Sequence, residues 1–222
     1  GTVVPPLSFI PQAEATGAII PMTRHIVRQA LQELKPVLDN DPAFHVAFNI
    51  VAQDFTGSDF IARMKAILQD CQVSESQVVF ELTERQQLTD DRAIRTIVQS
   101  VRDAGFRVAL DDTGTGHNGL SHVQSLGVDI IKIDKRFVDF VETDQAAHAV
   151  VEMLIRLANR LGMETVAEGI ESNAQKDILR AMGVHAGQGY LVSKPVPAAD
   201  FIGMFAANTL RGVIAPAQDH LR

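Results

Sequence analysis

The chain has 222 residues, of which 46% are hydrophobic and 21% are charged, a mixture typical of a globular domain and unlike that of a disordered chain. Its formal net charge of −7 argues against a protein that binds long nucleic acid through a basic face. Cys71 is the only cysteine, which excludes an intrachain disulfide and a cysteine-based zinc site.

Short apolar runs rich in β-branched residues alternate with helical patterns along the chain. The runs predict buried parallel strands at His45–Ile50, Val78–Leu82, Arg107–Leu110, Val128–Ile133, Glu164–Ala167 and Ala186–Leu191. The remaining patterns predict helices over Thr23–Leu38, Ser58–Gln69, from Asp90 or Asp91 to Ala104, from Thr143 to Gly162 and from Ser172 to Gly183. This alternation indicates an α/β fold with a parallel sheet, either a barrel or a doubly wound sheet.

Six strands are two fewer than a closed (β/α)8 barrel contains, and the opening Gly1–Pro6 is typical of a loop. We therefore expect a single domain over residues 1–222 that begins partway into its fold and ends in a peripheral tail at 209–222. No apolar stretch is long enough to span a membrane and no signal peptide is recognisable. These features predict a cytoplasmic domain, which a membrane-anchored parent protein could carry beside regulatory segments outside this chain.

Each predicted strand ends at or near a polar side chain, and together these are Asn49, Glu81, Asp111 with Asp112, Lys132, Glu168 and Gln188. The carboxyl ends of parallel barrel strands converge on one face, where active sites lie. Four carboxylates and one amide oxygen form a hard oxygen set that suits Mg²⁺, Mn²⁺ or Ca²⁺. Two adjacent aspartates are a natural bridge between two such ions, which could clamp a phosphodiester, while Lys132 neutralises phosphate charge or holds the attacking water.

Each of these residues also has a structural explanation. A single acidic residue at a strand end is more commonly a solvated charge or a helix cap. Lys132 would serve equally well as a barrel residue paired with a carboxylate, Asn49 as a turn former and Gln188 as a loop hydrogen-bonder. Glu84 and Glu171 fit supporting roles better than direct ligation. The coincidence of polar residues on six successive strands favours the functional interpretation.

Residues 114–119 fit the dinucleotide-binding pattern G-x-G-x-x-G, and Asp134 lies twenty residues after Gly114, where a ribose-binding acid is expected. Two aspartates beside a pyrophosphate, and the position of the pattern in mid-chain, argue against this alternative. The seven histidines are scattered without an H-E-x-x-H motif, which argues against zinc. No G-x-S-x-G motif supports a serine nucleophile.

Seven ordered motifs resemble those of EAL domains: Phe-Ile-Pro-Gln-Ala-Glu at 9–14, Phe-Asn-Ile at 48–50, Glu-Leu-Thr-Glu at 81–84, Asp-Asp-Thr-Gly-Thr-Gly at 111–116, Ile-Lys-Ile-Asp at 131–134, Ala-Glu-Gly-Ile-Glu at 167–171 and Gln-Gly-Tyr at 188–190. The resemblance runs from about Phe9 to Phe201. It implies a modified TIM (β/α)8 barrel, with six of the eight strands in this chain. It also implies hydrolysis of cyclic-di-GMP to linear pGpG with two Mg²⁺ or Mn²⁺ ions.

The resemblance also implies residue roles. The expected metal ligands are Asn49, Glu81, Asp111, Asp112 and Glu168, with Asp111 bridging the two ions. Lys132 resembles the family lysine that contacts the hydrolytic water, so the residues nearest the chemistry are Lys132, Glu168, Asp111 and Asp112. The residues expected to bind substrate or support the site are Glu84, which resembles the glutamate that holds the Asp-Asp-Gly loop, Glu171 and Gln188.

Two departures from the family pattern affect these expectations. The name-giving Glu-Ala-Leu, whose glutamate binds metal in the family, would lie just before residue 1, so we expect weak or no turnover from the 222-residue chain alone. In the loop after the aspartates, Thr113 replaces the usual Phe, and residues 117–119 replace the usual Tyr-Ser-Ser. That loop contributes to homodimer formation and regulation in the family. Two hypotheses remain: an active phosphodiesterase, or a catalytically weak or inactive receptor for cyclic-di-GMP or for a protein partner.

Overall fold

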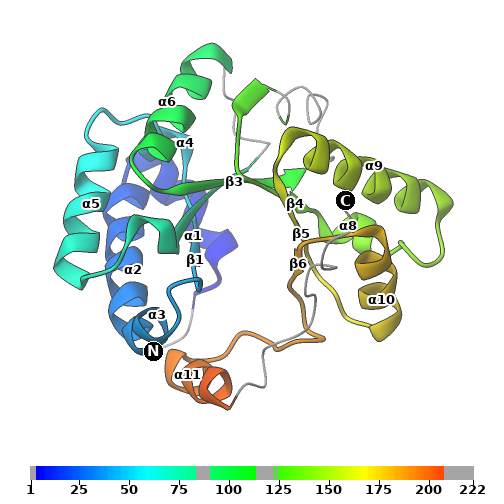
Figure 1. The fold of residues 1–222 in the computed structure, drawn as a ribbon. Helices are drawn as coiled ribbons and strands as arrows, with labels where there is room; N and C mark the ends of the chain where they lie inside the picture. The colour runs from blue at the N-terminus through cyan, green and yellow to red at the C-terminus, as the bar shows by residue number, and fades with distance from the viewer. Residues whose placement is uncertain (1–3, 84–90, 114–122, 124, 208–222) are drawn as a thin grey trace.

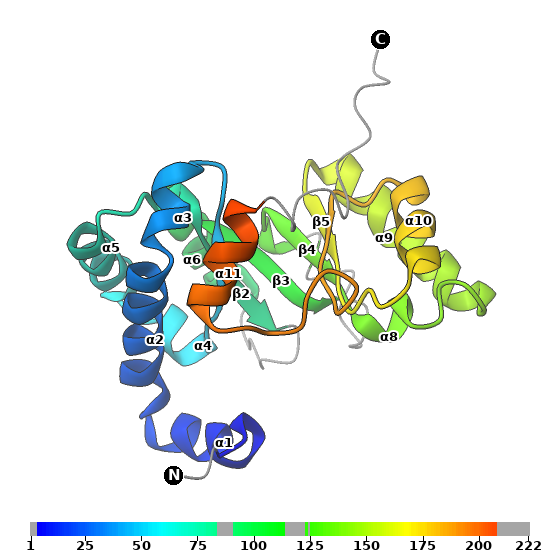
Figure 2. The ribbon, with the colours of Figure 1, turned by 90° about the horizontal axis from the view of Figure 1, so that it is seen from below.

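The computed structural model describes residues 4–83, 91–113, 123 and 125–207 (Figure 1). Its strands are β1 (Val46–Asn49), β2 (Val78–Thr83), β3 (Arg107–Thr113), β4 (Ile130–Ile133), β5 (Glu164–Ala167) and β6 (Ala186–Gly187). They form one parallel sheet in the order β1-β2-β3-β4-β5-β6. The sheet is curved, with helices along its outer side (Figures 1 and 2).

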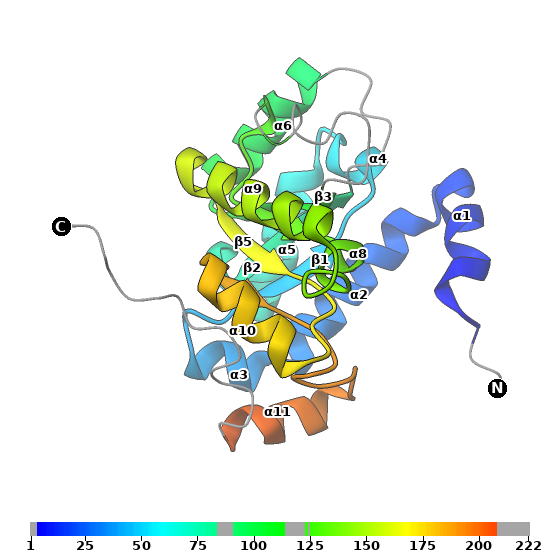
Figure 3. The ribbon, with the colours of Figure 1, turned by 90° about the vertical axis from the view of Figure 1, so that its right-hand side faces the viewer.

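The described helices are α1 (Pro6–Thr16), α2 (Ile19–Glu33), α3 (Lys35–Asn40), α4 (Ala52–Phe55), α5 (Phe60–Cys71), α6 (Asp91–Asp103), α8 (Lys135–Val138), α9 (Gln145–Leu161), α10 (Asn173–Met182) and α11 (Ala198–Ala206), with a 3₁₀ turn at Glu75–Gln77. Figure 3 shows α1 projecting away from the sheet. Helix α11 packs back near the start of the sheet, where the ring centroids of Phe201 and Phe205 lie 5.9 and 5.4 Å from that of Phe44. Within the described ranges, no helix has the length and apolar character to cross a membrane.

The six predicted strands are confirmed, and their order distinguishes the two predicted architectures. In a doubly wound sheet the strand order reverses at a switch point, whereas here every strand lies beside its neighbours in the chain. The described residues therefore form a curved α/β half-barrel of six parallel strands, which agrees with the predicted partial barrel. The predicted tail at 209–222 and the single-domain assignment are not tested, since the tail lies outside the described residues.

Several predicted boundaries differ from the structure, and two of the differences have a clear local cause. The strand predicted at Ala186–Leu191 ends at Gly187, because the chain then turns closely against Ile170: a Cβ on Gly189 would lie 2.2 Å from the Ile170 nitrogen. The helix predicted at Thr23–Leu38 is divided at Leu34 into α2 and α3. Pro36 explains this division, since it lacks the N–H that a continuous helix requires and restricts the residue before it.

Four helices, α1, α4, α8 and α11, are absent from the sequence prediction. Helix α1 begins at Pro6, in a segment predicted as a loop; proline suits this first position because its missing N–H has no helical partner there. The helix expected from Thr143 instead begins at Gln145, and the Asp144 carboxylate caps it by accepting a hydrogen bond from the Ala146 N–H. Ser172 and Gly183 bound α10 as predicted.

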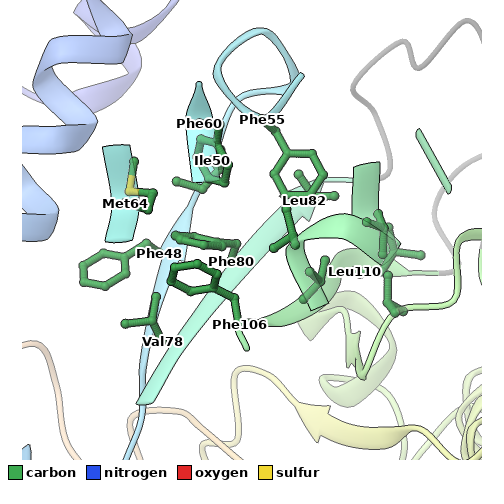
Figure 4. Close-up of a cluster of buried hydrophobic side chains, with 14 of the residues drawn as sticks. Phe48, Ile50, Phe55, Phe60, Met64, Val78, Phe80, Leu82, Phe106 and Leu110 are labelled. Carbon is green, nitrogen blue, oxygen red and sulfur yellow. The ribbon is translucent and has the colours of Figure 1, made fainter. Parts of the chain in front are cut away.

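The side chains of the strands divide between two faces with a period of two. Those on the convex face, among them Phe80, Leu82 and Leu110, pack with side chains of α5 and α6 in the main core. A chain of aromatic contacts crosses this core, with centroid distances of 5.4 Å for Phe55–Phe60, 5.1 Å for Phe60–Phe80 and 5.0 Å for Phe80–Phe106 (Figure 4). The concave face has a smaller apolar cluster of Val79, Ala109 and Ile130, backed by Val166. The next inward positions along these strands are therefore available for polar residues.

Replacing a central core ring tests this division of the sheet. Phe80→Ala should lower the free energy of unfolding by about 3–5 kcal/mol, since Phe80 is fully buried and its loss leaves a cavity. The matched control Phe140→Ala, at a side chain that is 55% exposed, should change it by less than about 0.5 kcal/mol. Urea unfolding measures both values, and equal losses would contradict the assignment of the core.

Candidate active site

Three carboxylates converge on one ammonium group at the carboxyl ends of the strands. Lys132 Nζ, from β4, lies 2.8 Å from Glu81 Oε2 of β2, 3.3 Å from Asp111 Oδ1 of β3 and 2.7 Å from Glu168 Oε1, directly after β5. Ile131 and Ile133 belong to the outward-facing core, so Lys132 between them faces the concave side. Its side chain is only 6% exposed, which makes this a buried cluster of charges.

The cluster has more negative than positive charge. With every group ionised, three carboxylates and one ammonium leave a net charge of −2. Burial lowers the pKa of Lys132, but Glu81, Glu168 and Asp111 outweigh this effect and raise it, so the lysine stays protonated. Burial raises the pKa of Glu168, and although Lys132 opposes this, Asp111 and Glu81 raise it further. One lysine therefore does not fully compensate the three carboxylates.

A divalent cation fits this site by donor chemistry and by charge. Carboxylate oxygens are the ligands that Mg²⁺, Mn²⁺ and Ca²⁺ prefer, and two further positive charges would neutralise the cluster. Glu81, Asp111 and Glu168 would hold the ion, with Lys132 beside it. The carboxylates are here directed at Lys132, and within the described part of the chain no three histidine, cysteine or acidic side chains have the arrangement of a finished metal site.

The two consecutive aspartates lie within a β-bulge near the end of β3. Leu110 pairs with Ile131 and Thr113 with Ile133, so three steps along β3 match two along β4. Within the bulge, Asp112 has a φ of +56°, a left-handed conformation that costs an aspartate less than most residues. Its N–H donates to Asp111 Oδ1 at 2.9 Å.

The Asp112 carboxyl lies close enough to Asp134 to contribute to lowering the pKa of Asp134. Asp134 caps α8 by accepting from the Arg136 N–H at 2.7 Å and pairs with the Arg136 guanidinium at 3.3 Å. Burial raises the pKa of Asp134, but its hydrogen bonds with Arg136, together with Asp112, have the larger combined effect and lower it. Asp134 therefore serves as a helix cap, which argues against the role of ribose-binding acid in the dinucleotide alternative. The glycine motif of that alternative, at 114–119, lies outside the described residues.

Of the other predicted site residues, one contacts the cluster, two do not, and one lies outside the described residues. Gln188 joins the cluster, since its Nε2 donates to Glu168 Oε1 at 2.8 Å. Asn49 ends β1 in register with Glu81 but is exposed. Glu171 is directed elsewhere and pairs with Lys135 at 2.8 Å. Glu84 lies outside the described residues.

Sequence reasoning missed Asp134 as a partner of Asp112 and Lys135 as a partner of Glu171. The only sequence signal for Asp134 is the helix-capping tendency of an aspartate after a strand, and it predicts no contact with Asp112. The signal for Lys135 is weaker still, since its contacts depend on how the loop after β5 folds. Both residues follow Lys132 closely in the chain, at the start of α8.

Removing the central lysine tests the charge balance of the cluster. Lys132→Met should lower the free energy of unfolding by about 3–5 kcal/mol, because the buried Glu81 and the partly buried Asp111 and Glu168 lose their counter-charge. Added Mn²⁺ should restore part of this loss. The control Lys65→Met breaks an exposed pair with Glu75 and should cost less than about 1 kcal/mol.

Denaturant unfolding with and without Mn²⁺ measures these differences. Adding Glu168→Gln to Lys132→Met should recover stability, since it removes one of the uncompensated charges. A Lys132→Met chain as stable as the Lys65→Met chain would contradict the charge imbalance.

Comparison with known proteins identifies the class of this fold and site. The sequence matches the family described as "EAL domain" over residues 1–195. "Probable cyclic di-GMP phosphodiesterase PdeB" of Escherichia coli (strain K12) is 38% identical over 202 residues, which cover 91% of this chain and 38% of that protein. "Cyclic di-GMP phosphodiesterase PdeL" of the same organism is 37% identical over 201 residues, covering 90% of this chain and 56% of that protein.

Solved structures give the same result. The EAL enzyme Bd1971, in a form with cAMP and cyclic-di-GMP bound, has a TM-score of 0.83 at 30% identity over 90% of this chain and 56% of that one. BlrP1 of Klebsiella pneumoniae, in a complex with manganese and cyclic-di-GMP, has a TM-score of 0.72 at 25% identity over 79% of this chain and 45% of that one. The chain therefore belongs to the EAL domain family, and it spans 38% and 56% of the two curated relatives.

Proposed function

We propose that this domain hydrolyses cyclic-di-GMP to linear pGpG with two divalent ions, Mg²⁺ or Mn²⁺. The observation that carries the proposal is the cluster of Glu81, Asp111 and Glu168 around the buried Lys132, whose excess negative charge suits metal ions. Relatives named cyclic di-GMP phosphodiesterases and EAL structures that contain cyclic-di-GMP and manganese support it. As this substrate is an intracellular messenger, the proposal places the domain in the cytoplasm.

In this proposal the metal ligands are Asn49, Glu81, Asp111, Asp112 and Glu168. The bound ions would polarise the phosphodiester and lower the pKa of a water molecule. Lys132, whose ammonium lies among these carboxylates, would donate hydrogen bonds to the attacking water or to a phosphoryl oxygen. Gln188 holds one oxygen of Glu168 and limits its rotation. Water adds to phosphorus as the bond to the 3′-oxygen breaks, and that oxygen takes a proton and leaves.

Turnover of cyclic-di-GMP tests the proposal directly. The 222-residue chain, and in parallel a form extended upstream to include the expected Glu-Ala-Leu, are incubated with cyclic-di-GMP and Mn²⁺ or Mg²⁺, and pGpG is followed by chromatography. We expect strong turnover from the extended form and little from the shorter one. Glu81→Gln should reduce turnover by at least about 100-fold, since it removes a charged ligand while keeping the side-chain shape.

Glu75→Gln is the matched control, because Glu75 lies in an exposed pair with Lys65 before the start of β2, at the opposite end of that strand. It should leave turnover unchanged. If neither form hydrolyses cyclic-di-GMP while calorimetry still detects its binding, the domain is a receptor and the enzymatic proposal is wrong.

A further inference from the structure

The loop that carries Glu168 makes two close backbone contacts. A Cβ on Gly169 would lie 2.3 Å from Lys135 Cγ and 2.6 Å from Lys135 Cδ. A Cβ on Gly189 would lie 2.2 Å from the Ile170 nitrogen. Gly169 also has a φ of +70°, so the absence of a side chain serves both its backbone conformation and this close approach.

Lys135, whose side chain is half-exposed, has contacts at both ends of that side chain. It is the first residue of α8, directly after the Asp134 cap. Its Nζ lies 2.6 Å from Asp139 Oδ1 and 2.8 Å from Glu171 Oε1, and these hydrogen bonds raise the pKa of Lys135. The Glu171 N–H donates to Gln175 Oε1 at 2.8 Å, within the capping box that begins α10. Lys135 therefore links α8 to the start of α10 across the backbone of Gly169.

Glu168 directly precedes Gly169, the residue against which Lys135 packs. Its N–H donates to the Ile133 carbonyl at 3.1 Å, while its carboxylate contacts Lys132 and Gln188. Beyond it, the Ile170 N–H donates to the Gln188 carbonyl at 3.0 Å. The methylene chain of Lys135 packs against the Gly169 backbone, and this packing opposes rotation of the segment that orients Glu168.

We propose that Lys135 is a positioning residue, whose stem against Gly169 and ion pair with Glu171 set the orientation of Glu168 for metal binding. This inference rests on the proposed function for its metal, but the packing around Gly169 stands independently of that function. Lys135 also lines a cavity of about 1040 Å³ together with Glu168 and Gln188. The competing role for its ammonium is therefore direct contact with substrate in that cavity.

Three substitutions separate the contribution of the Lys135 methylene chain, the stem, from that of its ammonium charge. Lys135→Arg keeps both, Lys135→Met keeps the stem and removes the charge, and Lys135→Ala removes both. Calorimetric titration with Mn²⁺, without substrate, should give a Kd within about twofold of the unmodified value for Lys135→Arg, about threefold higher for Lys135→Met and about tenfold higher for Lys135→Ala. The KM for cyclic-di-GMP at saturating Mn²⁺ should stay unchanged in all three, measured in the extended form.

The matched control is Arg156→Met, which breaks an exposed pair with Glu152 on α9 and should leave Mn²⁺ binding unchanged. A Lys135→Ala chain with lower stability but an unaltered Kd for Mn²⁺ would overturn the proposal in favour of a purely structural role. A raised KM with unaltered Mn²⁺ binding would also overturn it, in favour of direct contact with substrate.

Hydrogen–deuterium exchange separates this proposal from the proposed function. In the absence of metal, amides at 168–171 should exchange about tenfold faster in Lys135→Ala than in Arg156→Met, if the Lys135 stem orders the loop. If the extended form without substitutions binds no Mn²⁺ and shows no turnover, the proposed function fails, and the exchange rates still decide the positioning role. Equal exchange in the two variants would overturn it.

Discussion

The contact between Lys132 and three carboxylates is the interaction on which the rest of the site depends. Glu81 and Asp111 come from β2 and β3, and Glu168 follows β5, so the three lie on either side of Lys132 in β4. They would repel one another without a cation between them. The lysine reduces this repulsion but leaves two negative charges uncompensated. In the proposed function, that remainder attracts divalent ions to the concave face, and the stability of the domain would then depend on their presence.

The period of two in the strands separates stability from chemistry. Outward residues such as Phe80 and Leu82 pack with the helices and form the main core, whereas inward residues such as Glu81 face the polar cluster. On the same concave face, the apolar cluster of Val79, Ala109 and Ile130 is small. A substitution at the site therefore removes no side chain from the helix-packed core.

The sequence predicted the four residues of the central cluster because each one ends a strand of strong apolar character. In a parallel sheet with neighbours in chain order, the ends of those strands must meet, so Glu81, Asp111, Lys132 and Glu168 were predicted together. Helix α10 was predictable for a similarly local reason, since Ser172 and Gly183 mark its ends.

Features that depend on distant contacts were not predictable. The direction of Asp112 follows from a bulge in the pairing of β3 with β4, which the sequence of β3 alone does not indicate. The role of Lys135 requires the close approach of Gly169, and the early end of β6 requires that of Ile170.

The start of α1 at Pro6 was missed for a local reason, because proline is common in loops as well as at the first position of helices.

The most direct test of this account is an anomalous difference map from crystals of the domain grown with Mn²⁺. Binding driven by the carboxylate excess predicts a manganese peak in contact with Glu81, Asp111 and Glu168, with the Lys132 ammonium displaced from their centre. A map with no peak there, and with Lys132 still bound to all three carboxylates, would contradict the central claim.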